Sequence, residues 1–194
     1  MLEIRFHGCG GQGTVIASIL MAKAFFQAGY YVQSFPLFGV ERRGAPVEAY
    51  LRLARQKILV RTNVYTPDHV VVLDRTLIQS VDVTRGLKPG GWILINAPAV
   101  PEPLDAFAGF RLALVDATQI ALRHRLGTRT HPIVNTAMMG AFARVLGDPP
   151  LEPIARAIEE EVPTKRKENV AAAREAFDAV VTIGLIEAAA RATA

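Results

Sequence analysis

A glycine loop near the amino terminus is the first segment whose residue types and spacing could do chemistry. It reads Gly8-Cys-Gly-Gly-Gln-Gly13, which fits the pattern G-x-G-x-x-G. Glycines permit a tight turn and close approach of the backbone to a ligand, and the first turn of a helix offers free N–H groups to an anion. The loop therefore predicts a phosphate or pyrophosphate contact, with a tight turn that binds nothing as the alternative. The candidate contacts are Gly8, Gly10, Gly11, Gln12 and Gly13.

The end of the second predicted strand argues against the best-known ligand of such loops. A nicotinamide dinucleotide is held by an acid about 20 residues after the glycines, where the second strand ends. Here that strand ends in Gln33-Ser-Phe-Pro36, and the first acid afterwards is Glu41, which lies beyond the strand. NAD binding therefore loses most of its support. Gln12 either caps the turn or reaches a ligand, and we favour the cap.

Two adjacent arginines form the second candidate site. Arg42 and Arg43 lie in a predicted loop, 38–46, and are flanked by glycines. Guanidinium groups are planar forks that pair with carboxylate or phosphate oxygens, so the pair could bind an anion. Solvent-exposed loop charge is the alternative.

Further polar residues lie at predicted strand and helix ends. Asp74 and Asn96 each follow or end a buried strand, and we favour a helix cap and a turn over ligand contacts. Asn135 and Thr136 either cap a helix or face the site. His7, at the end of the first strand, is expected to be a hydrogen-bonded strand histidine.

Alternating strands and helices must position these residues. Apolar runs and alternation predict strands over 2–7, 30–35, 47–53, 70–73, 92–96 and 111–116. Helical spacing, capping residues and glycine stops predict helices over 14–28, 117–126, 136–146, 151–162 and 165–192. The pattern predicts a single α/β domain, 1–194, with a Rossmann-like, doubly wound, mostly parallel sheet and a helical carboxy-terminal portion.

Composition excludes several classes of protein. The 194 residues include one cysteine, Cys9, which cannot form an internal disulfide or hold an iron–sulfur cluster alone. The net charge of +4 is too small for a nucleic-acid-binding surface. The apolar runs are shorter than the ~20 residues that a membrane span requires. We expect a cytoplasmic protein with no nucleic acid or membrane partner.

Four segments in order give the chain a resemblance to a known family. They are His7 to Gly13, Gln33 to Pro46 with its Phe-Gly-Val-Glu-Arg-Arg-Gly-Ala-Pro run, Pro67 to Asp74, and Asn135 to Phe142. Together they resemble the gamma subunits of the pyruvate:ferredoxin oxidoreductase family over nearly the whole chain. The arginine-loop sequence is more similar to members acting on pyruvate or branched-chain oxoacids, although Val40 stands where many relatives have proline.

The resemblance implies a role inside a larger enzyme. Family members decarboxylate a 2-oxoacid on thiamine diphosphate, transfer the acyl unit to coenzyme A and pass two electrons through [4Fe–4S] clusters to ferredoxin. It implies that alpha, beta and delta-type subunits hold the thiamine diphosphate, the magnesium and the clusters. This chain would then be inactive alone, brace the assembly and contribute to the coenzyme A cleft.

Two readings of the arginine loop stay open under this resemblance. Arg42 and Arg43, with the glycine loop, could bind the phosphates of coenzyme A, or they could pair with a partner subunit across an interface. Two other functions also stay open: a stand-alone nucleotide-binding oxidoreductase, and a regulatory nucleotide-binding module. The first would need a ribose-binding acid and a catalytic pair, neither of which we find in the sequence.

Overall fold

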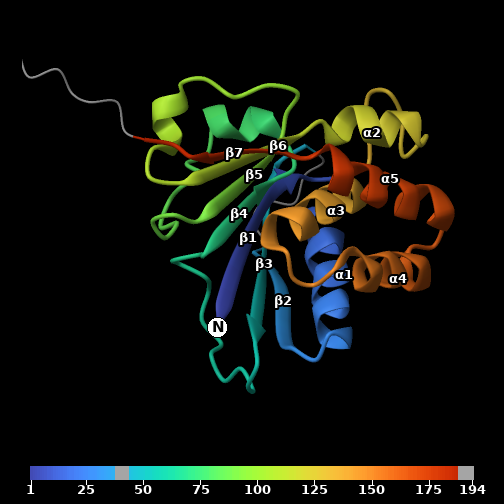
Figure 1. The fold of residues 1–194 in the computed structure, drawn as a ribbon, viewed down its shortest axis with the longest axis horizontal. Coiled ribbons are helices and arrows are strands. Elements are labelled where there is room, and N and C mark those ends of the chain that lie inside the picture. Colours follow the sequence, from blue (N-terminus) through green and yellow to red (C-terminus); the bar gives the residue numbers. More distant parts are fainter. Residues whose placement is uncertain (38–43, 188–194) are drawn as a thin grey trace, which may run out of the picture.

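A seven-stranded sheet organises the protein, and the computed structural model describes residues 1–37 and 44–187 (Figure 1). The strands are β1 (Leu2–Cys9), β2 (Tyr31–Leu37), β3 (Pro46–Ala54), β4 (His69–Val72), β5 (Trp92–Asn96), β6 (Arg111–Val115) and β7 (Val181–Leu185). They lie in the order β2-β3-β1-β4-β5-β6-β7. The three valines of β4 are fully buried, as expected of a strand covered on both faces.

Strand direction confirms the mostly parallel sheet and adds one feature that was not predicted. β1, β4, β5 and β6 pair in parallel, and β7 runs antiparallel to β6. β3 is antiparallel to both β1 and β2, so β1 and β2 point the same way, as a βαβ unit requires. β3 nevertheless lies between them, so the two parallel strands of this unit are not neighbours.

The α-helices share one face of the sheet. They are α1 (Thr14–Gln27), α2 (Ala117–Arg123), α3 (Asn135–Leu146), α4 (Leu151–Glu161) and α5 (Arg166–Ala179). α3 packs on α5, and α1 packs on α4, over a core that contains buried residues of every helix (Figure 1). The chain also contains two 3₁₀ helices, η1 (Arg75–Gln79) and η2 (Leu104–Phe107). They contribute to a second buried cluster on the opposite face of the sheet: Phe107 belongs to this cluster, and Ile78 packs against it.

The predicted helix over 165–192 is wrong in its second half. α5 ends at Ala179, and the chain continues as β7, which pairs with β6. The run Val180 to Ile183 is β-branched at every position, and such side chains favour extended backbone over helix. The edge of β6 is available for pairing with this segment, so the last described element of the chain is a strand and not a helix.

Three residues were expected to end a helix or a strand, and two of them do. Gly29 and Gly147 follow α1 and α3 with φ of 84° and 74°, a conformation that glycine adopts without strain. Pro36 was expected to end β2, but the strand continues to Leu37. β2 is an edge strand, and edge strands tolerate proline because N–H groups that face away from the sheet make no ladder bond. Within residues 1–37 and 44–187, no helix has the length and apolar character of a bilayer span.

Candidate functional site

The glycine loop joins β1 to α1 and is tied to the segment that precedes β3. Gly10 N donates to Ala45 O at 2.9 Å, and Gly44 N donates to Gly10 O at 3.2 Å. Gly11 and Gly13 have φ of 98° and 79°, in the left-handed region that favours glycine. The strand–glycine turn–helix unit predicted from the sequence is therefore present, and its backbone is held by long-range hydrogen bonds.

Gln12 closes the loop instead of pointing away from it. Its Oε1 accepts a hydrogen bond from Cys9 N at 2.8 Å, and its Nε2 donates to Asp74 Oδ2 at 2.7 Å. Burial alone raises the pKa of Asp74, but hydrogen bonds from Thr76 and Gln12 outweigh it and hold the pKa below its ordinary value. Gln12 therefore caps the turn, which agrees with the favoured interpretation. Asp74 is a helix cap, also as favoured, because its Oδ1 accepts from Thr76 N at the start of η1.

The structure brings Asn135 against the glycine loop, although Asn135 follows Gly13 by 122 residues in the sequence. A Cβ added to Gly13 would lie 2.5 Å from Asn135 Nδ2, so only glycine lets the amide approach the loop this closely. α3 begins at Asn135, one residue earlier than predicted, and Asn135 Oδ1 accepts from Thr136 N at 2.8 Å. Two segments that the sequence singled out separately therefore form one site.

A hollow of about 350 Å³ opens where these segments meet, and we call it the loop hollow. It is lined by the glycine loop, the first turn of α1, Val47, Ile133 and Asn135. The first helical hydrogen bond of α1 is donated by Ala17 N to Gly13 O, so the preceding amides of the helix have no intrahelical acceptor. Such amides, beside a side-chain amide, can bind a phosphate or another oxyanion.

Thr136 does not reach the loop hollow. It is fully buried, and its Oγ1 donates to Asn169 Oδ1 at 2.9 Å. Asn169 in turn donates to Lys165 O at 2.9 Å, so this polar chain ties α3 to the start of α5. The prediction that Thr136 contacts a cofactor is not favoured by this placement. Arg42 and Arg43 lie outside the described residues.

A second crevice lies at the carboxyl ends of β4, β5 and β6, the edge where open α/β sheets place ligands. It measures about 390 Å³, and Gln12 and Asp74 line it together with Asn96 and Thr118. Asn96 Nδ2 donates to Leu73 O at 2.9 Å and its Oδ1 accepts from Thr118 N at 3.2 Å. Asn96 therefore joins the end of β4 to the first turn of α2 instead of forming a turn, and Thr118 is a lining residue that the sequence analysis missed.

The titratable residues near the loop are poorly suited to catalysis. Burial raises the pKa of the Cys9 thiol to about 11, with Asp74 adding to the effect, so the thiol is protonated near neutrality. Burial and the charge of Arg5 lower the pKa of His7 to about 4, against the opposing effect of Glu48. His7 Nε2 is buried without a hydrogen-bond partner, and Nδ1 lies 3.7 Å from Glu48 Oε1, beyond hydrogen-bond distance. The expectation of a hydrogen-bonded strand histidine was therefore wrong, because the buried ring packs in the sheet without a polar partner.

The residues that the structure describes offer no cluster of side chains suited to a metal ion. Within the described ranges, no three His, Cys, Asp or Glu side chains gather closely enough to hold a metal ion. The sequence contains a single cysteine, and an iron–sulfur cluster requires about four thiolates.

Comparison with known proteins places this chain in a family. A family model for pyruvate ferredoxin/flavodoxin oxidoreductase matches residues 3–179. The common gamma subunit of pyruvate/ketoisovalerate oxidoreductases from Thermococcus kodakarensis is 50% identical over 190 residues, which cover 95% of this chain and 100% of that protein.

Solved structures agree. The crystal structure of pyruvate oxidoreductase subunit PORC from Thermotoga maritima matches with a TM-score of 0.79 and 38% identity, over 94% of this chain and 98% of that one. The 2-oxoglutarate:ferredoxin oxidoreductase from Magnetococcus marinus matches at a TM-score of 0.69 and 21% identity, over 91% of this chain and 30% of that one, which shows a shared fold. The chain belongs to the pyruvate ferredoxin/flavodoxin oxidoreductase family and corresponds to its gamma-type subunit.

Proposed function

We propose that the chain works in the cytoplasm as the non-catalytic gamma subunit of a multi-subunit 2-oxoacid:ferredoxin oxidoreductase. Alpha, beta and delta-type subunits would hold the thiamine diphosphate, the magnesium and the [4Fe–4S] clusters and would pass electrons to ferredoxin. One observation supports this division of labour: the sequence contains a single cysteine, and among the described residues no cluster of His, Cys, Asp and Glu could hold a metal ion.

The loop hollow is the part of the chain best suited to contribute to a coenzyme A cleft. Its helix-start amides and the Asn135 side chain offer donors to phosphate oxygens, and Gly13 keeps the backbone accessible. The structure from Magnetococcus marinus has coenzyme A bound, which is compatible with such a cleft in this fold. Arg42 and Arg43 would either add to the anion site or pair with another subunit.

Steady-state kinetics of the assembled enzyme separate these two roles of the arginines. The variant Arg42→Ala/Arg43→Ala is expected to raise the KM for coenzyme A at least about tenfold if the arginines bind phosphate, because charge-assisted hydrogen bonds are lost. Unchanged KM together with loss of subunits during purification would assign the arginines to the interface.

The purified chain alone tests the function as a whole. It should turn over neither a 2-oxoacid nor a nicotinamide, whereas adding the other subunits should restore coenzyme A-dependent ferredoxin reduction. Thermal unfolding of the single chain with NAD, ATP or coenzyme A reports ligand binding as a raised Tm. Turnover by the isolated chain would refute the proposal, and a Tm raised by NAD or ATP alone would favour a free nucleotide-binding protein.

A further inference from the structure

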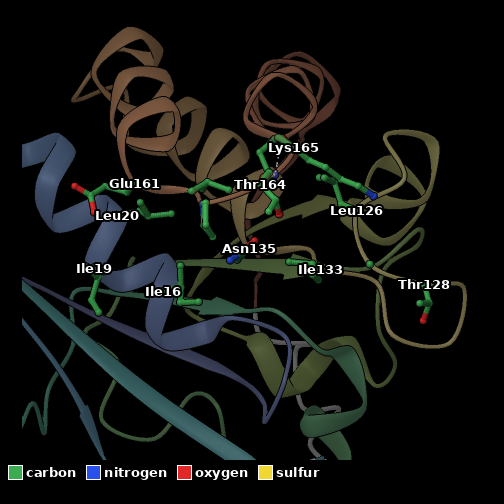
Figure 2. A pocket seen from close by; sticks show the side chains of 14 residues that line it. Ile16, Ile19, Leu20, Leu126, Thr128, Ile133, Asn135, Glu161, Thr164 and Lys165 are labelled. Atoms are coloured by element: carbon green, nitrogen blue, oxygen red, sulfur yellow. Dashed lines mark hydrogen bonds between the residues drawn. The ribbon is translucent and has the colours of Figure 1, made fainter.

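An apolar pocket of about 540 Å³ lies beside the loop hollow and has no role in the function described so far. Figure 2 shows Ile16 and Ile19 of α1 on one side, with Leu126 and Ile133 of the α2–α3 connection across from them. The connection between α4 and α5 closes the remaining side. Three elements far apart in the sequence therefore build the walls.

The mouth of this pocket leaves large aliphatic side chains in contact with solvent. Ile16, Ile19 and Ile133 are exposed by 52%, 43% and 40%. Single exposed apolar residues are common, but a cluster of them around a cavity is characteristic of an interaction site. All three isoleucines line the cavity and are still exposed by 40% or more, so the cavity and the apolar surface at its mouth are continuous. A partner surface that covers both therefore fits this site.

The charge around the pocket is uneven. Residues 117–147 contain four arginines and no aspartate or glutamate, and Lys-Arg-Lys follows at 165–167. We call Arg125, Arg129, Lys165 and Lys167 the basic rim; all four are exposed, and within the described part of the chain none forms a salt bridge. On the opposite side, Glu161 pairs with Lys23, and the neighbouring Glu159 and Glu160 are exposed without a salt bridge among the described residues, so the excess of positive charge is confined to the basic rim.

A hydrogen bond from a side chain to the backbone joins the two halves of the basic rim. Lys165 Nζ donates to Arg125 O, which links the start of α5 to the end of α2. Arg125 and Lys165 have φ of 56° and 52°, and among the described residues they are the two non-glycine positions in the left-handed region. Side chains rarely adopt this conformation, so the surrounding structure holds both turns in place.

We propose that this pocket and the basic rim form the docking site for an acidic, amphipathic helix of another subunit of the same enzyme. Aliphatic side chains at i and i+3 or i+4 of that helix would cover the three isoleucines and enter the cavity, and neighbouring Asp or Glu would face the rim. Buried aliphatic anchors supply affinity at such interfaces, and complementary charge speeds association and fixes orientation. The inference rests on the proposed function, because it requires a multi-subunit enzyme.

Photo-crosslinking in the assembled enzyme tests the site directly. The variant Ile19→p-benzoylphenylalanine is irradiated within the purified complex, and crosslinked peptides are identified by mass spectrometry. The expected product joins Ile19 to a peptide of another subunit that carries both aliphatic and acidic residues. Leu59, 78% exposed and outside the pocket, is the matched control position and should not capture that peptide. A crosslink to a second copy of this chain, to a peptide without acidic residues or to nothing would overturn the inference.

Charge reversal provides a second readout. Arg129→Glu/Lys167→Glu should weaken association with the other subunits at least about tenfold at low salt, with a smaller difference at high salt. Arg61→Glu, exposed and outside the pocket, should associate like the unaltered chain. Equal association of all three chains would contradict the docking site while leaving the proposed function intact. If even the unaltered chain forms no complex, the proposed function itself fails, and the inference with it.

Discussion

Gln12 and Asp74 are joined by a hydrogen bond of 2.7 Å from Nε2 to Oδ2, which links the glycine loop to the end of β4. Gln12 also accepts from Cys9 N, so one side chain binds the last residue of β1 and a residue that follows the adjacent strand β4. A loop held in this way keeps its amides oriented before any ligand arrives, and preorganised donors bind anions without paying for reordering at that moment.

Removing this link should destabilise the fold. Gln12→Ala leaves Cys9 N without its acceptor and Asp74 without one donor, so we expect a loss of about 1–3 kcal/mol in the free energy of unfolding. Urea titration of the isolated chain measures it. Gln79→Ala, at an exposed position on η1, should change stability by less than about 0.5 kcal/mol. Equal effects of the two substitutions would show that the link contributes nothing.

Gly13 and Gly11 form a matched pair for testing the contact with Asn135. Both have positive φ, so Gly11→Ala and Gly13→Ala each add backbone strain of about 1–2 kcal/mol. Only Gly13→Ala places a Cβ against Asn135 Nδ2, whereas a Cβ at Gly11 meets no atom within 4 Å. Gly13→Ala should therefore be the less stable variant by thermal unfolding and should bind coenzyme A more weakly in the complex. A smaller loss for Gly13→Ala than for Gly11→Ala would count against the contact.

Thr136 should behave as a structural residue. Thr136→Val leaves the buried Asn169 Oδ1 without its donor and should lower stability by about 1–3 kcal/mol. The KM of the assembled enzyme for coenzyme A should not change. A double-mutant cycle with Asn169→Ala isolates the pair, because the coupling between the two substitutions should exceed about 0.5 kcal/mol. A raised KM with unaltered stability would instead place Thr136 at the ligand.

Acid should destabilise the chain through His7. Its pKa is about 4 in the folded protein and 6.5 in the reference state, so between these values the unfolded chain binds more protons and stability falls as the pH falls. The full effect would be up to about 3 kcal/mol, complete below about pH 4. His7→Gln should lose stability less steeply across that range in urea titrations. The exposed His131→Gln should keep the slope of the unaltered chain, and an unchanged slope in His7→Gln would reject the assignment.

Cys9 should react slowly with thiol reagents. Its pKa of about 11, against a reference of 9.0, corresponds to about a hundredfold less thiolate near pH 8 than an ordinary cysteine carries. Iodoacetamide labelling of the folded chain should be slower than labelling of the urea-unfolded chain by at least that factor. Equal rates would mean that the thiol is neither buried nor affected by Asp74.

Local sequence patterns predicted the strand–glycine turn–helix unit well, because turn geometry and helical spacing depend on residues that are close in the sequence. Contacts between distant segments were harder. The approach of Asn135 to Gly13 depends on how α3 packs beside α1, which no local pattern contains.

Tertiary context also overrode two predictions. The segment after Ala179 became β7 because the edge of β6 was available for pairing. Pro36 was tolerated in an edge strand. β1 also contains a charged side chain that no sequence pattern placed in the core: Arg5 is 2% exposed and donates from Nη2 to Val83 O and Arg85 O. Carbonyl groups of a distant connection bind Nη2, whereas Nε is buried without a hydrogen-bond partner, and sequence periodicity cannot report such partners.

The antiparallel strand inserted beside β1 has a consequence for nucleotide chemistry. Strands in a sheet are spaced about 5 Å apart, so the carboxyl end of β2 lies about 10 Å from that of β1, twice the separation found when the two are neighbours. A carboxylate engineered at Phe35 would fall short of the ribose of any adenosine seated on the glycines. Converting this scaffold to a nicotinamide enzyme would therefore demand a change of strand order, because no point substitution shortens that gap.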